Sequence, residues 1–377
     1  MTEAELYPSA EEAFSRIGSL GGYVNPEVVA PLKGAAAHEV AVGPVHAGVI
    51  EPGHFRFQCM GEDVYNLQIF LGYQHRGVED AIVAANGNLA RQIALAETCA
   101  GDTSAAAATA FAQIMERAFP EKFLAPDGNA LRTRTLLLEL ERIANHTGDL
   151  GALAGDVAFL QTQALCGRIR GEYLNMTALV CGNRFARNAI IPGGVRVGLD
   201  EEKVQTLKNW IGRVKPELDR ALKLMFNEHS VCDRFDGVGV VSREIAREIG
   251  LVGVARRASE EFNGDVMARA LVRRIEIEQA HEKVAAILSG ETVSDGDEAH
   301  AEMGDGYLYV SANVPAWRGP LVHAAVFSPR GDMLRYKIAD PSARNWMGLA
   351  WALRGEQISN FPICNKSFNL SYCGTDR

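Results

Sequence analysis

The sequence contains no Cys-x-x-Cys pair, although it has seven cysteines, at positions 59, 99, 166, 181, 232, 364 and 373. An odd number of scattered cysteines argues against a framework of disulfide bonds and favours a reducing compartment. Long apolar runs are also lacking, because charged residues, glycine or proline interrupt each one well before the roughly 18 residues that a membrane span requires. We therefore expect a chain that is soluble or is held at a membrane by partners.

Basic residues are also fewer than acidic residues. The chain has 38 Lys and Arg against 47 Asp and Glu, a formal net charge of −9. No basic run reverses this balance locally, so we expect no nucleic acid among its partners. The first residues, MTEAELYPSAEEAF, lack the basic and apolar regions of a secretory signal, which predicts a cytoplasmic location.

Hydrophobic residues make up 47% of the 377 residues, enough for a sizeable core. We divide the chain into an N-terminal lead, residues 1–37, which looks loosely helical, and one domain, residues 38–377. Alternating apolar residues with Gly-Pro punctuation predict a β-hairpin or small sheet over residues 38–62. Three short extended runs predict a small antiparallel sheet between 306 and 340.

Apolar residues at helical spacing dominate the rest of the chain. In residues 200–228 they form one continuous stripe, with Asp200 placed to cap the helix start. Other predicted helices cover residues 76–118, 130–167, 257–289 and 341–353. The tail, residues 354–377, is expected to be mostly irregular. The predicted fold class is mainly α with small β-sheets (α+β), a helical bundle with an N-terminal β-hairpin region.

Four charged residues fall on neighbouring turns of the helix predicted over 257–289. They are Asp265, Arg269, Arg273 and Glu276. Their spacing predicts either a polar network or a partner-facing surface, and ion-paired helix faces are the commoner case.

Several motifs occur in one order from about residue 40 to the end. They are GPVH (43–46) with EPGHFRF (51–57), HRGVED (75–80), ERIANHTGDLGALAGD (141–156), GNRFARNAIIPGGVRVG (182–198), DRFDGVGVVSREIAREIGLVG (233–253), GDVMARALVRRIEIEQ (264–279), SPRGDMLRYKI (328–338) and TDR (375–377). Together they resemble the large subunit of energy-converting NiFe hydrogenases of the formate hydrogenlyase type. They also resemble the paralogous quinone-site (49 kDa-type) subunit of complex I. The resemblance implies the large-subunit fold for residues 38–377.

The resemblance implies a nickel site held by four cysteines in two Cys-x-x-Cys pairs, because nickel in such a centre needs soft thiolate ligands. The front pair aligns with Ala100 and Thr103, and the rear pair aligns with Ser371 and Gly374. A methyl group, a hydroxyl and a bare glycine do not replace thiolates. We therefore predict that this chain holds no nickel and binds no cofactor of its own.

Two cysteines lie one residue away from these positions, and each begins a Cys-x-x-Asp sequence. Cys99 precedes Asp102, and Cys373 precedes Asp376. Two thiolates and two carboxylates are a conceivable ligand set for a harder metal. The alternative interpretation is that these are ordinary small residues beside a vacated cavity.

The resemblance to complex I suggests a quinone as one candidate acceptor. In that family a His of the front hairpin and a Tyr of the segment equivalent to the front cysteine pair hold the quinone headgroup. This chain offers His46 and His54 but has Gly101 at the Tyr position, so at most half of that arrangement is present. Histidines titrate near neutral pH, so these two are candidates for proton relays or for structural hydrogen bonds.

The resemblance adds Glu79, from HRGVED, and Arg330, from SPRGD, as further cavity residues. It implies partners too: a small subunit with an iron–sulfur cluster, and membrane subunits similar to antiporters. We therefore predict a nickel-free component of a complex I-like redox complex, peripheral to the cytoplasmic membrane, that supports electron transfer coupled to ion translocation. Two alternatives are a hydrogenase with altered metal ligands and a structural subunit without a redox role.

Overall fold

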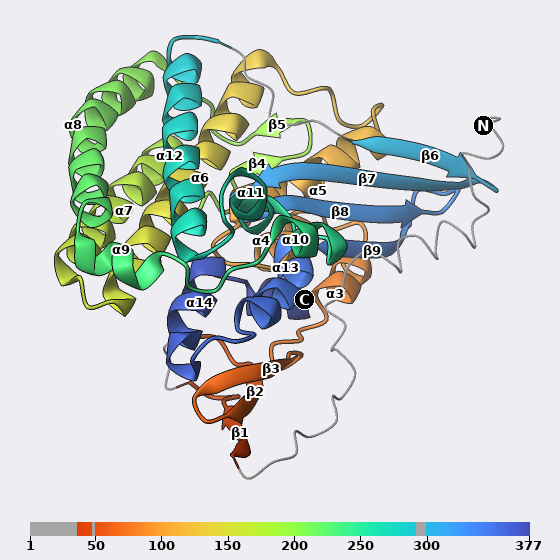
Figure 1. The fold of residues 1–377 in the computed structure, drawn as a ribbon. Coiled ribbons are helices and arrows are strands. Elements are labelled where there is room, and N and C mark those ends of the chain that lie inside the picture. Colours follow the sequence, from red (N-terminus) through yellow and green to blue (C-terminus); the bar gives the residue numbers. More distant parts are fainter. Residues whose placement is uncertain (1–35, 47–49, 292–298) are drawn as a thin grey trace.

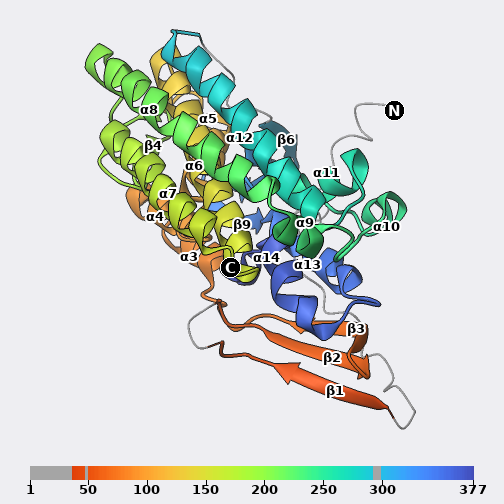
Figure 2. The same ribbon diagram turned by 60° about the vertical axis from the view of Figure 1, so that its left-hand side comes forward.

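A bundle of long helices forms one side of the molecule (Figures 1 and 2). The computed structural model describes residues 36–46, 50–291 and 299–377. The bundle consists of α6 (Gly128–Asp156), α7 (Leu160–Cys181), α8 (Glu201–Phe226) and α12 (Val266–Leu288). Helix α6 packs against α7 and α12, and α8 packs against α7.

Short polar side chains set where these helices begin. Asp127, Asp200 and Asp265 each accept a hydrogen bond from the backbone N–H three residues further on, at 2.7–2.8 Å. Such caps satisfy one of the free N–H groups of the first turn. The predicted cap at Asp200 is therefore confirmed, and the predicted stripe of α8 is buried at Leu207, Val214, Leu218, Leu222 and Met225.

The single helix predicted over residues 257–289 is wrong, because the chain breaks before Asp265. Helix α11 (Gly253–Glu261) ends there, and α12 starts in a new direction. Gly264 has a φ of +78°, and a Cβ at this position would lie 2.1 Å from the carbonyl oxygen of Val241. Only glycine fits such a close backbone approach at positive φ.

Two antiparallel sheets flank the helices. The larger has the order β6 (His300–Gly304), β7 (Tyr307–Ala316), β8 (Gly319–Phe327) and β9 (Met333–Ala339). Helix α5 (Ser104–Ala118) packs against β7 and β8, and α3 (Val78–Ala84) packs against β9. The smaller sheet, β1 (Ala37–Val42), β2 (His54–Met60) and β3 (Asp63–Phe70), projects below the bundle in Figure 2. Both predicted sheets are confirmed, each with one strand more than expected.

The tail is more regular than predicted. Helix α13 (Pro341–Ala352) is confirmed, and it is followed by the short helix η1 (Ile358–Asn360), α14 (Phe361–Phe368) and α15 (Tyr372–Asp376). The expectation of an irregular tail fails because these residues are apolar and buried, which the short segments do not reveal by periodicity. The lead, residues 1–35, lies outside the described residues.

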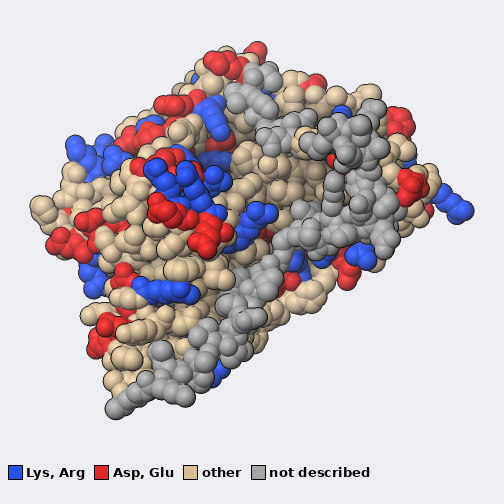
Figure 3. All heavy atoms as spheres, turned by 45° about the vertical axis from the view of Figure 1, so that its right-hand side comes forward, with Lys and Arg blue, Asp and Glu red and all other residues tan. Residues whose placement is uncertain are grey.

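The remaining elements are short. They are α4 (Leu89–Glu97), β4 (Ile190–Ile191), β5 (Gly194–Val195), α9 (His229–Phe235) and α10 (Arg243–Glu248). The α+β fold class is therefore confirmed. Among the described helices, none combines the length and the apolar character needed to cross a bilayer. Figure 3 shows acidic and basic side chains intermixed on one face, consistent with the modest negative net charge.

Candidate functional site

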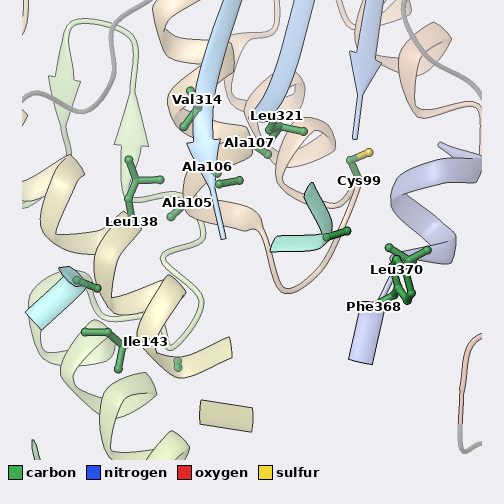
Figure 4. Close-up of a cluster of buried hydrophobic side chains, with 14 of the residues drawn as sticks. Cys99, Ala105, Ala106, Ala107, Leu138, Ile143, Val314, Leu321, Phe368 and Leu370 are labelled. Carbon is green, nitrogen blue, oxygen red and sulfur yellow. The ribbon is translucent and has the colours of Figure 1, made fainter. Parts of the chain in front are cut away.

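The two segments that align with the cysteine pairs meet in the centre of the molecule. The front segment is the loop between α4 and α5, and the rear segment runs from the end of α14 into α15. Figure 4 shows Cys99 on this loop, with Phe368 and Leu370 of the rear segment in the same cluster of buried side chains. The sequence positions from opposite ends of the chain are therefore brought together, as the resemblance implies.

An ion pair occupies the front of this centre. The guanidinium of Arg318 donates to both carboxylate oxygens of Asp102, at 2.8 and 2.7 Å. Its Nε donates to the carbonyl of Asn369, in the rear segment, at 2.7 Å. Burial alone would raise the pKa of Asp102, but Arg318 outweighs that effect and holds the pKa below its ordinary value.

The hydroxyl of Thr103, at the second front position, is fully used within the protein. It donates to Asp102 Oδ1 at 3.0 Å and accepts from Trp317 Nε1 at 3.2 Å and Arg318 Nη1 at 3.3 Å. Ala100, at the first front position, is buried and offers only a methyl group. Neither position presents a donor atom to a central metal.

The second rear position, Gly374, is closed by a buried carboxylate. A Cβ on Gly374 would lie 2.6 Å from Asp340 Oδ2, so the space that a cysteine side chain would need is already filled. Ser371 Oγ accepts from the Gly374 N–H at 2.9 Å and acts as the N-cap of α15. Burial raises the pKa of Asp340, and the nearby Arg318 opposes that shift.

The thiols of the two nearby cysteines are both harder to ionise than a free cysteine. Burial raises the pKa of the Cys99 thiol, and the neighbouring Asp340 and Cys373 raise it further. Burial also raises the pKa of Cys373 to about 11, and Glu51 adds to that shift while Ser371 opposes it. Both environments therefore favour the neutral thiol over the thiolate.

The structure does not assemble the ligand set of Cys99, Asp102, Cys373 and Asp376. Asp102 is held by Arg318, and the Asp376 carboxylate accepts from the N–H groups of Gly72 at 2.7 Å and Gln74 at 2.8 Å. Within residues 36–46, 50–291 and 299–377, no group of three or more His, Cys, Asp or Glu side chains is arranged to hold a metal ion.

Glu79 lies in a second ionic cluster that fixes the end of the chain. It accepts from Lys337 Nζ at 2.6 Å and from the backbone N–H of Ile338 at 2.9 Å, and it pairs with Arg377 Nη1 at 3.1 Å. Glu79 thereby ties α3 to β9 and to the last residue. This arrangement accounts for Glu79 as an architectural residue beside the centre.

His46 and His54 both bind backbone carbonyls of the β1–β2 connection. His46 Nε2 donates to Gly53 O at 2.7 Å, and His54 Nδ1 donates to Gly43 O at 3.3 Å. The same connection reaches the rear segment through Glu51, which accepts from the N–H groups of Tyr372 at 3.1 Å and Cys373 at 3.3 Å. The two histidines therefore shape a loop that contacts the centre.

The placement of Arg330 in the cavity is wrong. Arg330 is exposed in the turn between β8 and β9, where its backbone N–H donates to Ser328 Oγ at 3.2 Å. The arginine of the centre is Arg318, just before β8, which the sequence motifs did not single out. The Trp317-Arg318-Gly319 sequence at a hairpin corner was the available signal, since a buried arginine requires a partner.

A buried network lies behind Trp317. His146 Nε2 donates to Glu276 Oε2 at 2.7 Å, and its ring lies edge-on to Trp317 with centroids 5.8 Å apart. Arg142 and Arg257 also contact Glu276. Burial opposes ionisation of Glu276, but His146 and the two arginines lower its pKa to about 2. The network predicted from Asp265, Arg269, Arg273 and Glu276 takes another form. Glu276 pairs with His146 and Arg142 of α6 and with Arg257 of α11, whereas Arg273 pairs with Asp149 of α6.

Comparison with known proteins agrees with this architecture. Residues 156–261 match the family of the 49 kDa subunit of respiratory-chain NADH dehydrogenase. The chain is 26% identical over 354 residues to hydrogenase-4 component G of Escherichia coli (strain K12), covering 90% of this chain and 62% of that protein. It is 25% identical over 370 residues to formate hydrogenlyase subunit 5 of the same organism, covering 90% and 63%. The chain thus spans less than two thirds of the length of these two relatives.

A solved structure shows the same fold. A chain of the membrane-bound sulfane sulfur reductase, an archaeal respiratory membrane complex, superposes with a TM-score of 0.78 at 21% identity, over 91% of this chain and 99% of that one. The resemblance drawn from the motifs is therefore confirmed.

Proposed function

We propose that this chain, a relative of the large subunits of membrane-bound hydrogenases and of respiratory complex I, is a nickel-free component of a membrane-associated redox complex. The relatives named above are components of hydrogenase, formate hydrogenlyase and respiratory complexes. In the proposed role, the chain is the scaffold on which electrons arrive from an iron–sulfur partner subunit. It passes conformational changes to membrane subunits that move ions.

The observation that carries the nickel-free assignment is the occupation of the vacated centre by the protein's own groups. The Asp102–Arg318 pair fills the front, and Asp340 lies where a side chain at position 374 would project. The side chain of a cysteine at position 374 would clash with the Asp340 carboxylate. Cysteine is absent at the four aligned positions, and at position 374 the space for its side chain is closed as well.

The final acceptor is proposed to be a quinone or another carrier bound near the β1–β2 connection. Glu51 links this connection to the rear segment, so a change at one is transmitted to the other. Gly101 offers no hydroxyl for a quinone headgroup. A quinone would therefore need a different set of contacts from the arrangement in complex I.

Metal analysis of the complex tests the nickel-free assignment. The chain is purified from its native membranes through an affinity tag, and nickel and iron are measured per chain. We expect nickel far below one atom per chain, together with iron that belongs to a co-purifying subunit. One nickel per chain would refute the assignment.

Activity measurements on the same complex test the redox role. We expect reduction of an added acceptor such as a soluble quinone, and no hydrogen uptake. Substitution His46→Gln should alter acceptor reduction while the subunits still co-purify. A complex that assembles but reduces no acceptor would indicate a purely structural subunit.

A further inference from the structure

A groove of about 430 Å³ opens beside the vacated centre. Its wall includes Asp102 and Asn145 of the centre, glycines of α6 and α7, and residues of α14 and the segment after it. In Figure 2 these three helices lie next to one another near the C-terminus. The volume lies within the usual range for small-molecule sites, roughly 300–1,000 Å³.

The carboxylates in this groove are already neutralised. Asp102 forms its two hydrogen bonds with Arg318. Asp149 accepts from Arg273 Nε at 2.8 Å through one oxygen and from Asn369 Nδ2 at 2.6 Å through the other. Both arginines are buried, so the two acidic side chains contribute no net negative charge to the groove.

The basic side chains in the groove are not neutralised. Arg170 and Lys366 both line it. Among the described residues, neither side chain has an ion pair within 4.0 Å, although Lys366 attracts Asp156 over a longer distance. The groove therefore presents two cationic side chains that have no close acidic partner among the described residues.

The backbone makes room for one of these cations. A Cβ on Gly148 would lie 2.8 Å from Arg170 Cδ and 3.0 Å from its Nε. The guanidinium stem thus rests against bare backbone of α6, where a larger residue would displace it. This contact holds Arg170 along the groove without using its hydrogen-bond donors.

We propose that this groove binds a small dianion, with Arg170 and Lys366 as its two cationic contacts. Guanidinium and ammonium groups bind compact oxyanions and carboxylates through charge-assisted hydrogen bonds. The ligand would lie next to the Asp102–Arg318 pair, because Asp102 also lines the groove. This site differs from the predicted quinone contacts at the β1–β2 connection.

Isothermal titration of the purified complex with sodium sulfate tests the proposal, with sodium chloride at equal ionic strength as the blank. We expect saturable sulfate binding that weakens about tenfold or more in Arg170→Gln and in Lys366→Gln, because each substitution removes a charged hydrogen bond. Arg170→Lys, which keeps the charge, should retain more affinity than Arg170→Gln. Lys208→Gln, a change of an exposed lysine on α8 away from the groove, is the matched control and should bind normally.

A second titration, with succinate, distinguishes an inorganic oxyanion from a dicarboxylate as the ligand. Stronger binding of sulfate indicates an inorganic oxyanion, and stronger binding of succinate indicates a dicarboxylate. No saturable binding of either probe, or equal binding by wild type and both Gln variants, would overturn the proposal. A third result would also overturn it: the wild type binds neither anion, and the Gln variants lose their co-purifying subunits. The groove would then be a docking surface for a subunit.

The proposal stands apart from the nickel-free function. Metal content and acceptor reduction are measured without sulfate, so a failed titration leaves them unchanged. Conversely, a nickel-containing complex that binds sulfate through Arg170 would refute only the nickel-free assignment.

Discussion

At the scale of single residues, the vacated centre is defined by what replaces sulfur. Three charged side chains lie where the resemblance implies a metal: Asp102, Arg318 and Asp340. Asp102 and Arg318 bond each other, and Asp340 accepts from the backbone N–H of Ser342 at the start of α13. Buried charges persist only when they are paired or well hydrogen-bonded. The centre is therefore a set of mutually dependent groups, and changes to any one of them should be costly.

Substitution Gly374→Ala should destabilise the protein by about 2 kcal/mol, as is typical of overpacking in a filled core. The new Cβ would lie 2.6 Å from Asp340 Oδ2. Urea unfolding measures the effect. Gly212→Ala is the control, because a Cβ there meets nothing within 4 Å and the position is inside α8, so this change should be neutral or slightly stabilising. Equal effects of the two substitutions would contradict overpacking as the cause.

Substitution Arg318→Gln should cost about 3 kcal/mol, because it leaves Asp102 and its neighbours without their guanidinium. We place the effect at the low end for buried pairs, since the Asp102 side chain is 35% exposed. Thermal or urea unfolding provides the measurement. Arg56→Gln breaks the exposed pair with Glu39 and should cost less than about 1 kcal/mol. A cost for Arg318→Gln as small as this would show that the pair is not structural.

Titration of Glu141 should change the stability of the fold with pH in the opposite direction to titration of Asp102. Burial raises its pKa to about 8, although its carboxylate accepts from the N–H groups of Ala105 and Ala106. The folded state therefore holds this proton more tightly than the unfolded state. Its stabilising contribution is complete below the unfolded pKa and is lost as pH rises towards about 8.

We expect Glu141→Gln to reduce the loss of stability between pH 6 and pH 9, measured as the melting temperature at each pH. Gln keeps an oxygen for the same backbone donors and has no charge to bury. A parallel pH profile for wild type and variant would show that Glu141 does not titrate in this range.

At the scale of elements, glycine positions decide where helices stop and how segments approach one another. The break between α11 and α12 allows Asp265 to cap α12 and to accept from the Gly237 N–H at 2.8 Å. Apolar periodicity continues on both sides of this break, so the pattern alone predicts one helix. The deciding feature is a backbone contact with Val241, which is distant in sequence.

Substitution Gly264→Ala should destabilise by more than the roughly 1–2 kcal/mol that a left-handed conformation costs a non-glycine residue, because its Cβ also meets the Val241 carbonyl. Gly250→Ala is the matched control, with a φ of +70° and nothing within 4 Å of the new Cβ. The difference in unfolding free energy between the two variants isolates the contact. No difference would show that the backbone shifts freely.

At the scale of the whole molecule, the chain joins its first described sheet to its last helices around one centre. The β1–β2 connection contacts the rear segment through Glu51. Arg318, just before β8, joins the rear segment at Asn369 to the loop before α5 at Asp102. The centre is therefore built from segments that are distant in the sequence. This means that isolated fragments should not reproduce the site.

We expect the chain to be found with membranes only while its partners are present. Deleting the gene of the iron–sulfur subunit should move the chain from the membrane fraction to the supernatant, as measured by immunoblotting after ultracentrifugation. An unrelated soluble protein serves as the marker for complete separation. Retention at the membrane without that subunit would indicate direct binding or another anchor.

The sequence by itself determined the family resemblance, the α+β class and both sheets, because motifs and periodicity are local properties. It indicated where the chain is helical but not the breaks within residues 76–118, 130–167 and 257–289. Through that resemblance it also predicts four positions where thiolates are missing. It could not show that Arg330 is exposed and that Arg318 is central, since both are arginines in similar hairpin contexts. Only the tertiary structure decided that the vacated space is filled by Asp340 and an ion pair, because those contacts join residues separated by as many as 216 positions. Long-range packing, which no short pattern encodes, therefore sets what this centre can bind.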